Sequence, residues 1–435
     1  MQRPNTTSDE PWPIDQDSHP FDTKAYQPWS TEQAYRHTLV SGDEGRLIIR
    51  GGTTYAAASD FDGYAQRIVV DHPLDWFKQQ ATTPARTLKL AIYAHGGINS
   101  EKESIQRIRV LAPYFQANGI YPIFLTWRTG FFETVYDLSK DCAHKIFGEP
   151  ERFGISPWLQ EQMDRKIEEV ASLPKVKSIW NKMRQNAESG TSETPQRDHV
   201  LDMLARKLVV LKKKAWSGQN AHLELHLVGH SAGSILLGHL LERMLRDDLR
   251  SDAPSVATFT LYAAACSTRF AVEKYLPAAD ARLIDLSRLW LHYLSDEREK
   301  DDKVRPGQLR WPEYGNSLLY LVSRALDDRP KMPLLGMERA LDPKYAADGD
   351  QWAPEEFASL QAWQARWKPN VDSVQLGLAV TDPMVRVTKN NDEGSQMKAA
   401  HGSFDNSIDA ITTTLERIKG GALIGPVEWL DYSTS

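Results

Sequence analysis

A five-residue stretch, Gly229-His230-Ser231-Ala232-Gly233, contains the residue types that nucleophilic catalysis requires. An alternating apolar run over residues 223–228 precedes it, and an apolar run with helical spacing follows it. This order predicts a strand, a sharp turn and a helix, with Ser231 at the turn. A serine held there projects its hydroxyl away from the backbone, and the helix behind it directs amide groups toward the same point. Ser231 is therefore the predicted nucleophile, and the alternative is an ordinary helix cap.

A second glycine motif, His95-Gly96-Gly97, follows an apolar run at residues 88–93 that predicts another strand. Glycines leave backbone amides accessible, so a turn of this kind can stabilise the negative charge that develops on a carbonyl oxygen during acyl transfer. The alternative is a turn that only reverses the chain.

Together the two motifs resemble the α/β-hydrolase fold and its lipase and esterase members. The resemblance implies an α/β protein with a mostly parallel central sheet flanked by helices. It also implies a triad in the order serine, acid, histidine, with oxyanion amides from Ala232 and Gly97. That chemistry needs no metal and no diffusible cofactor.

The family carries its acid on the loop after a strand, which here is predicted at residues 289–294. Asp302 begins an Asp-Lys-Val sequence that matches the family pattern, and Asp296, nearer to the strand, is the alternative. The family's histidine follows the last strand, predicted at residues 374–380, and precedes a C-terminal helix. His401 fits that order and setting. The charged run that contains both aspartates is also compatible with a plain solvated loop.

Three further histidines lie in or just before the nucleophile motif, at positions 222, 226 and 230. Their spacing matches a metal site only on a helix, and the alternation of the segment predicts a strand instead. We therefore expect no metal site here.

The chain divides into four expected parts: a flexible N-terminal arm at residues 1–44, a first part of the hydrolase core at 45–127, a helical insertion at 128–220 and a second part of the core at 221–435. Early strands are predicted at 47–52 and 64–70. The insertion contains amphipathic helical patterns and is interpreted either as a cap over the site or as additional packing helices.

Composition restricts the class of protein. The 435 residues are 41% hydrophobic and carry a net charge of −6, which does not suggest a nucleic-acid surface. The only cysteines, Cys142 and Cys266, are far apart, and the N-terminus lacks an apolar signal region, so we expect a cytoplasmic protein. A lysine run at 212–214 fits a solvated helix face, with peripheral membrane contact as the alternative.

The expected function is hydrolysis of carboxylic esters, small-molecule or lipid, through an acyl-enzyme on Ser231. Alternatives are an acyltransferase, peptidase or thioesterase on the same triad, or a binding protein that retains the fold without catalysis.

Overall fold

The computed structural model describes most of the central part of the chain. It covers residues 27–50, 60–80, 87–96, 101–127, 174–302, 315–345, 351–368, 379–382, 384–386 and 396–430, together with 161, 164–165, 167–169 and 172. Within these residues, no helix is long and apolar enough to cross a membrane.

A single large sheet organises the molecule, with strand order β2-β1-β4-β3-β5-β6-β7-β8. Strand β2 is antiparallel to β1, and every other neighbouring pair is parallel. The strands are β1 (Thr38–Ser41), β2 (Leu47–Ile48), β3 (Thr87–Ala94), β4 (Ile120–Trp127), β5 (His222–His230), β6 (Val256–Tyr262), β7 (Leu289–Leu294) and β8 (Ala379–Val380). The predicted α/β architecture with a mostly parallel sheet is confirmed.

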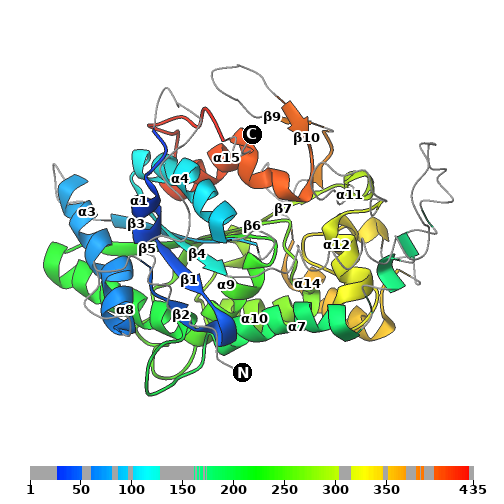
Figure 1. Ribbon diagram of the computed structural model, residues 1–435, viewed down its shortest axis with the longest axis horizontal. Coiled ribbons are helices and arrows are strands. Elements are labelled where there is room, and N and C mark those ends of the chain that lie inside the picture. The colour runs from blue at the N-terminus through cyan, green and yellow to red at the C-terminus, as the bar shows by residue number, and fades with distance from the viewer. Residues whose placement is uncertain are drawn as a thin grey trace, which may run out of the picture.

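Helices cover both faces of this sheet (Figure 1). Helices α4 (Glu101–Ala117) and α15 (Ile408–Lys419) lie on one face, and α8 (Val200–Gln219), α9 (Gly233–Met244) and α10 (Thr268–Asp280) lie on the other. Because both faces are covered, the central strands must be apolar on both sides, and all eight residues of β4 are buried.

The N-terminal part of the chain differs from the expectation. Helix α1 (Thr31–Arg36) and strand β1 belong to the fold, and β1 pairs with β4 along residues that are all buried. The arm predicted over residues 1–44 is therefore wrong for residues 31–44, and residues 1–26 lie outside the described part.

The strand predicted at residues 64–70 is also wrong, because this segment is helical. Helix α2 (Phe61–Gln66) continues through a π-helical turn (Arg67–Asp71) into α3 (His72–Gln80). The Asp60 side chain accepts a hydrogen bond from the Gly63 amide at 2.9 Å and so begins the helix. Its buried residues, Tyr64, Ala65 and Ile68 to Val70, recur at helical spacing, and this pattern outweighs the strand preference of the valines and isoleucine.

The insertion expected at residues 128–220 contains a helix of the core. Helix α8 packs against β5, α9 and β1 as the crossover before β5, so it is a packing helix and not a cap. Helix α7 (Pro174–Ser189) packs against α9 and the turn after β1. Residues 128–160 lie outside the described part, so the cap remains a prediction for that segment.

Three short helices follow strand β7 in the described part of the chain. The first two are α11 (Asp296–Asp301) and α12 (Leu318–Leu321) (Figure 1). Helix α13 (Glu338–Leu341) comes next in the chain. The Leu335 and Gly336 amides each donate to the segment after β6, to Cys266 O and Ala264 O at 2.8 Å. A side chain on Gly336 would place its Cβ 2.4 Å from the Ala264 nitrogen, so only glycine permits this approach.

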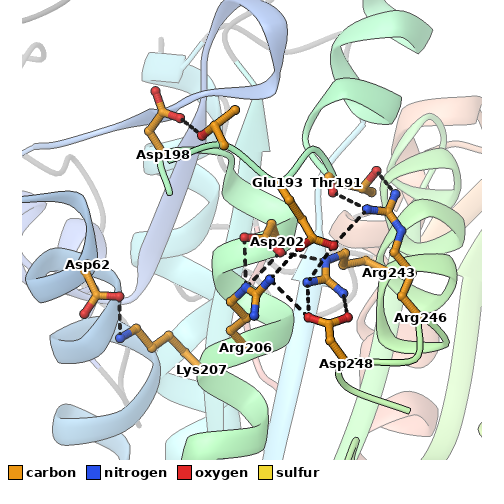
Figure 2. A network of polar contacts seen from close by, with 11 residues as sticks. Asp62, Thr191, Glu193, Asp198, Asp202, Arg206, Lys207, Arg243, Arg246 and Asp248 are labelled. Atoms are coloured by element: carbon orange, nitrogen blue, oxygen red, sulfur yellow. Dashed lines mark hydrogen bonds and ion pairs between the residues drawn. The ribbon is translucent and has the colours of Figure 1, made fainter. Parts of the chain in front are cut away.

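A network of ion pairs, of which Arg243–Asp202 is fully buried, joins α8 to α9, the helix that follows Ser231 (Figure 2). The fully buried Arg243 guanidinium donates to Asp202 at 2.6 Å and to both oxygens of Asp248 at 2.8 Å. Arg206 on α8 contacts the same two carboxylates at 3.1 Å. The network fixes the far end of α9 against α8, and therefore helps to fix the direction in which α9 leaves the turn at Ser231.

Candidate active site

Ser231 lies at the turn between β5 and α9, as predicted, and its backbone has a φ of +52°. This left-handed conformation is uncommon for a residue with a side chain and is maintained by neighbouring hydrogen bonds. The Ser231 amide donates to Tyr262 O at 2.8 Å, and its carbonyl accepts from the Ala265 amide at 3.1 Å and the Ser234 hydroxyl at 2.7 Å. The turn is thus held from β6 and from α9.

The glycines of the two motifs allow three segments to approach Ser231 closely. A Cβ on Gly233 would lie 2.1 Å from the Ala94 carbonyl oxygen at the end of β3, and one on Gly96 would lie 2.9 Å from the Ser231 Cβ. A Cβ on Gly229 would lie 2.9 Å from side chains on both α9 and β6. These positions exclude larger residues, which explains the glycines at the observed spacing.

His401 brings a base to Ser231 from 170 residues further along the chain. Its Nε2 lies 2.8 Å from the Ser231 hydroxyl oxygen, and both side chains are almost completely buried. Burial and, to a smaller extent, nearby His230 lower the pKa of His401 to about 3. The ring is therefore neutral near pH 7, so Nε2 can accept the serine proton.

Of the two aspartates proposed as the acid, Asp302 contacts His401. One carboxylate oxygen of Asp302, at the end of α11, accepts the backbone amide hydrogen of His401 at 2.6 Å. Burial raises the pKa of Asp302 to about 6. Within the described part of the chain, the Nδ1 atom of His401 has no hydrogen-bond partner.

In the described part of the chain, the Asp296 carboxylate is bonded to three other side chains and not to His401. Its carboxylate accepts from Arg339 and Lys300, both at 2.6 Å, and from the Tyr320 hydroxyl. These bonds link α11 to α12 and α13. Among the described residues none of the bonds of Asp296 goes to His401, so the structure brings together Ser231, His401 and Asp302 and leaves Asp296 outside.

Of the two residues predicted to stabilise the oxyanion with their amides, the structure describes one, Ala232. Ala232 is the N-cap of α9, directly after Ser231, and its amide makes no hydrogen bond among the described residues. Gly97 lies outside the described residues. His95, just before it, is a packing residue: its ring lies against Tyr93 and Phe124, burial lowers its pKa to about 3, and its carbonyl accepts from the Trp127 indole at 2.9 Å.

Two residues near His401 were not predicted from the sequence, Asp405 and Arg107. Asp405 is fully buried four residues after His401, in the 3₁₀ helix His401–Asn406, and pairs with Arg107 of α4 at 2.5 Å. Despite the burial, the Arg107 charge and His230 hold the pKa of Asp405 well below its usual range. Neither residue belongs to a motif, and only their proximity in the fold identifies them.

His222, His226 and His230 lie along strand β5, as the alternation of the sequence predicts. Among the described residues no cluster of histidine, cysteine, aspartate and glutamate has an arrangement suited to a metal ion. Of the two cysteines, Cys266 is buried and unpaired, and Cys142 lies outside the described part.

Comparison with protein-family models, with curated proteins and with solved structures found no match to this chain.

Proposed function

We propose that this protein is a serine hydrolase of the α/β-hydrolase type that cleaves carboxylic esters. The observation that carries the proposal is Ser231, held at positive φ between β5 and α9, with its hydroxyl 2.8 Å from Nε2 of a buried, neutral histidine. A nucleophile and a base within hydrogen-bond distance are the minimum that acyl transfer requires.

In the proposed reaction, His401 Nε2 takes the hydroxyl proton as the Ser231 oxygen attacks the ester carbonyl carbon. The tetrahedral intermediate collapses when His401 returns that proton to the alcohol oxygen, which leaves an acyl group on Ser231. Water then attacks the acyl carbon, gives a proton to His401, and releases the carboxylic acid as the Ser231 hydroxyl is restored.

The oxyanion is assigned to the Ala232 amide, which follows the nucleophile at the positive end of α9. Each such donor is worth about 2.7–4 kcal/mol in enzymes of this kind. Gly97 is proposed as the source of the second amide, by position in its motif alone.

Asp302 is proposed as the acid that supports His401. It reaches the backbone amide of the same residue, and the unpaired Nδ1 of His401 is the group that a triad acid would orient. In this role its carboxylate would balance the positive charge that forms on the ring during attack.

The test is labelling of the purified protein with a fluorophosphonate, followed by peptide mapping and by hydrolysis of short p-nitrophenyl esters. We expect the label on Ser231, and loss of both labelling and hydrolysis in Ser231→Ala and His401→Ala. Ser255→Ala, at an exposed position, is the control and should behave as wild type. A folded wild-type protein that neither takes the label nor hydrolyses any ester would refute the proposal.

A further inference from the structure

The peptide groups on both sides of His401 are held by side chains. Its amide donates to Asp302 at 2.6 Å, and its carbonyl oxygen accepts from Nε2 of His230 at 3.0 Å. A carbonyl oxygen can only accept, so the proton of His230 must be on Nε2. His230 directly precedes the nucleophile, so this bond connects the backbone of the base to the residue beside Ser231.

His230 also lies beside a buried carboxylate. Its Nδ1 lies 3.7 Å from Asp405, and the same carboxylate pairs with Arg107 on α4. The rings of His230 and His401 lie 5.5 Å apart at an angle of 31°. Arg107, Asp405 and His230 therefore follow one another from α4 to the loop that carries His401. The Arg107–Asp405 contact is a direct ion pair, and the distance from Asp405 to His230 is longer than a hydrogen bond.

The charge of Asp405 also acts on the base directly. Burial is the largest influence on the His401 pKa and lowers it, whereas Asp405 raises it. A carboxylate kept ionised at this place makes the positive form of His401, which the proposed reaction needs, less unfavourable.

We infer that His230, Asp405 and Arg107 are positioning residues that hold the His401 backbone in register with Ser231. The inference rests on the proposed function, because register matters only if His401 receives the Ser231 proton. A misplacement of about 1 Å in such a pair can lower a rate by roughly 100-fold, which is why a backbone clamp on the base has a measurable effect.

The experiment compares two substitutions at one position. His230→Gln keeps an N–H donor near the place of Nε2, and His230→Leu has similar bulk but no donor. We expect His230→Leu to lower kcat for a p-nitrophenyl ester and the fluorophosphonate labelling rate of Ser231 by roughly 10- to 100-fold, with KM within about twofold of wild type. His230→Gln should recover most of both rates. Asp405→Asn, which keeps the shape and removes the charge, should lower kcat in the same way.

Thermal unfolding of each variant separates positioning from stability. If His230→Leu and His230→Gln lower the labelling rate equally, or if both lower only the melting temperature, the inference is wrong. If His230→Leu does not fold, the Gln and Asn variants still decide: wild-type kcat in Asp405→Asn together with impaired kcat in His230→Gln would overturn it. Failure of the proposed function is a separate result, namely no labelling of the wild-type protein.

Discussion

Burial favours the neutral form of the Asp302 carboxyl group, whereas the proposed reaction requires the charged form beside His401. Burial raises the pKa of this group to about 6. We expect kcat/KM of the wild type to fall as the pH decreases through about 6, because the carboxyl group then becomes neutral. Asp302→Asn should lower kcat/KM by at least roughly 100-fold near pH 8, as measured by ester hydrolysis across pH 5 to 9.

The raised pKa of Asp302 also determines how the stability of the fold should change with pH. A carboxyl group whose pKa is raised on folding favours the folded state when protonated, and this contribution is lost as the pH rises through its folded pKa. The melting temperature should therefore depend less on pH in Asp302→Asn than in the wild type between about pH 4 and 6, the interval between the ordinary and the raised pKa. The activity measurement has its own contradicting outcome. If kcat/KM of the wild type decreases only at a pH far below 6, Asp302 is not the group whose protonation lowers the activity.

The comparison of Asp302 with Asp296 shows which individual residues could be predicted from the sequence and which could not. The sequence placed Ser231 at a turn between a strand and a helix and proposed His401 as its partner from motif and order, and the structure brings the two side chains within 2.8 Å. The Asp-Lys-Val pattern favoured Asp302, but only the contacts of Asp296 with α12 and α13 show that it has another role. Asp405 could not be predicted, because its partners lie on α4 and β5, far away in the sequence.

At the scale of elements, the buried strands were predicted and the N-terminal helices were not. Strands β3, β4 and β5 are apolar runs bounded by turns, which an interior parallel sheet requires. The segment at 64–70 contains β-branched residues, yet it is helical because its buried residues repeat at the helical period and Asp60 caps it. Tertiary packing thus decides where local preference is ambiguous.

The contact between α8 and α9 gives a prediction at this scale. Arg243→Met should lower the free energy of unfolding by about 3–5 kcal/mol, because it leaves the buried Asp202 with less compensating charge. Urea denaturation at pH 7 measures the change. Arg246→Met is the control: this arginine is partly exposed and should cost about 1 kcal/mol or less. Equal losses in the two variants would show that the buried network does not stabilise this interface.

At the scale of the whole molecule, the segment at residues 424–429 packs against the end of α4 and is hydrogen-bonded to it. The Asn118 side chain, buried just after α4, donates to Gly425 O at 2.8 Å and accepts from the Ile424 amide at 2.7 Å. The Tyr114 hydroxyl donates to Trp429 O at 3.0 Å. Helix α4 also carries Arg107, so this segment supports the layer behind the candidate site.

Asn118→Ala should destabilise the protein by about 2–3 kcal/mol, because buried backbone groups of residues 424 and 425 lose their partners. Hydrogen exchange measures the local effect, and the Ile424 amide should exchange faster. Gln116→Ala, at a partly exposed position in the last turn of α4, is the matched control. Unchanged protection at Ile424 would show that other contacts hold the segment.

The separation of 170 residues between Ser231 and His401 has a consequence for biosynthesis. A ribosome that adds about 5–20 residues per second makes Ser231 roughly 10–30 s before His401. During this interval the emerging chain has the serine but lacks the group that would activate it. A partly synthesised chain is therefore incapable of the proposed chemistry until the segment that contains His401 has been made.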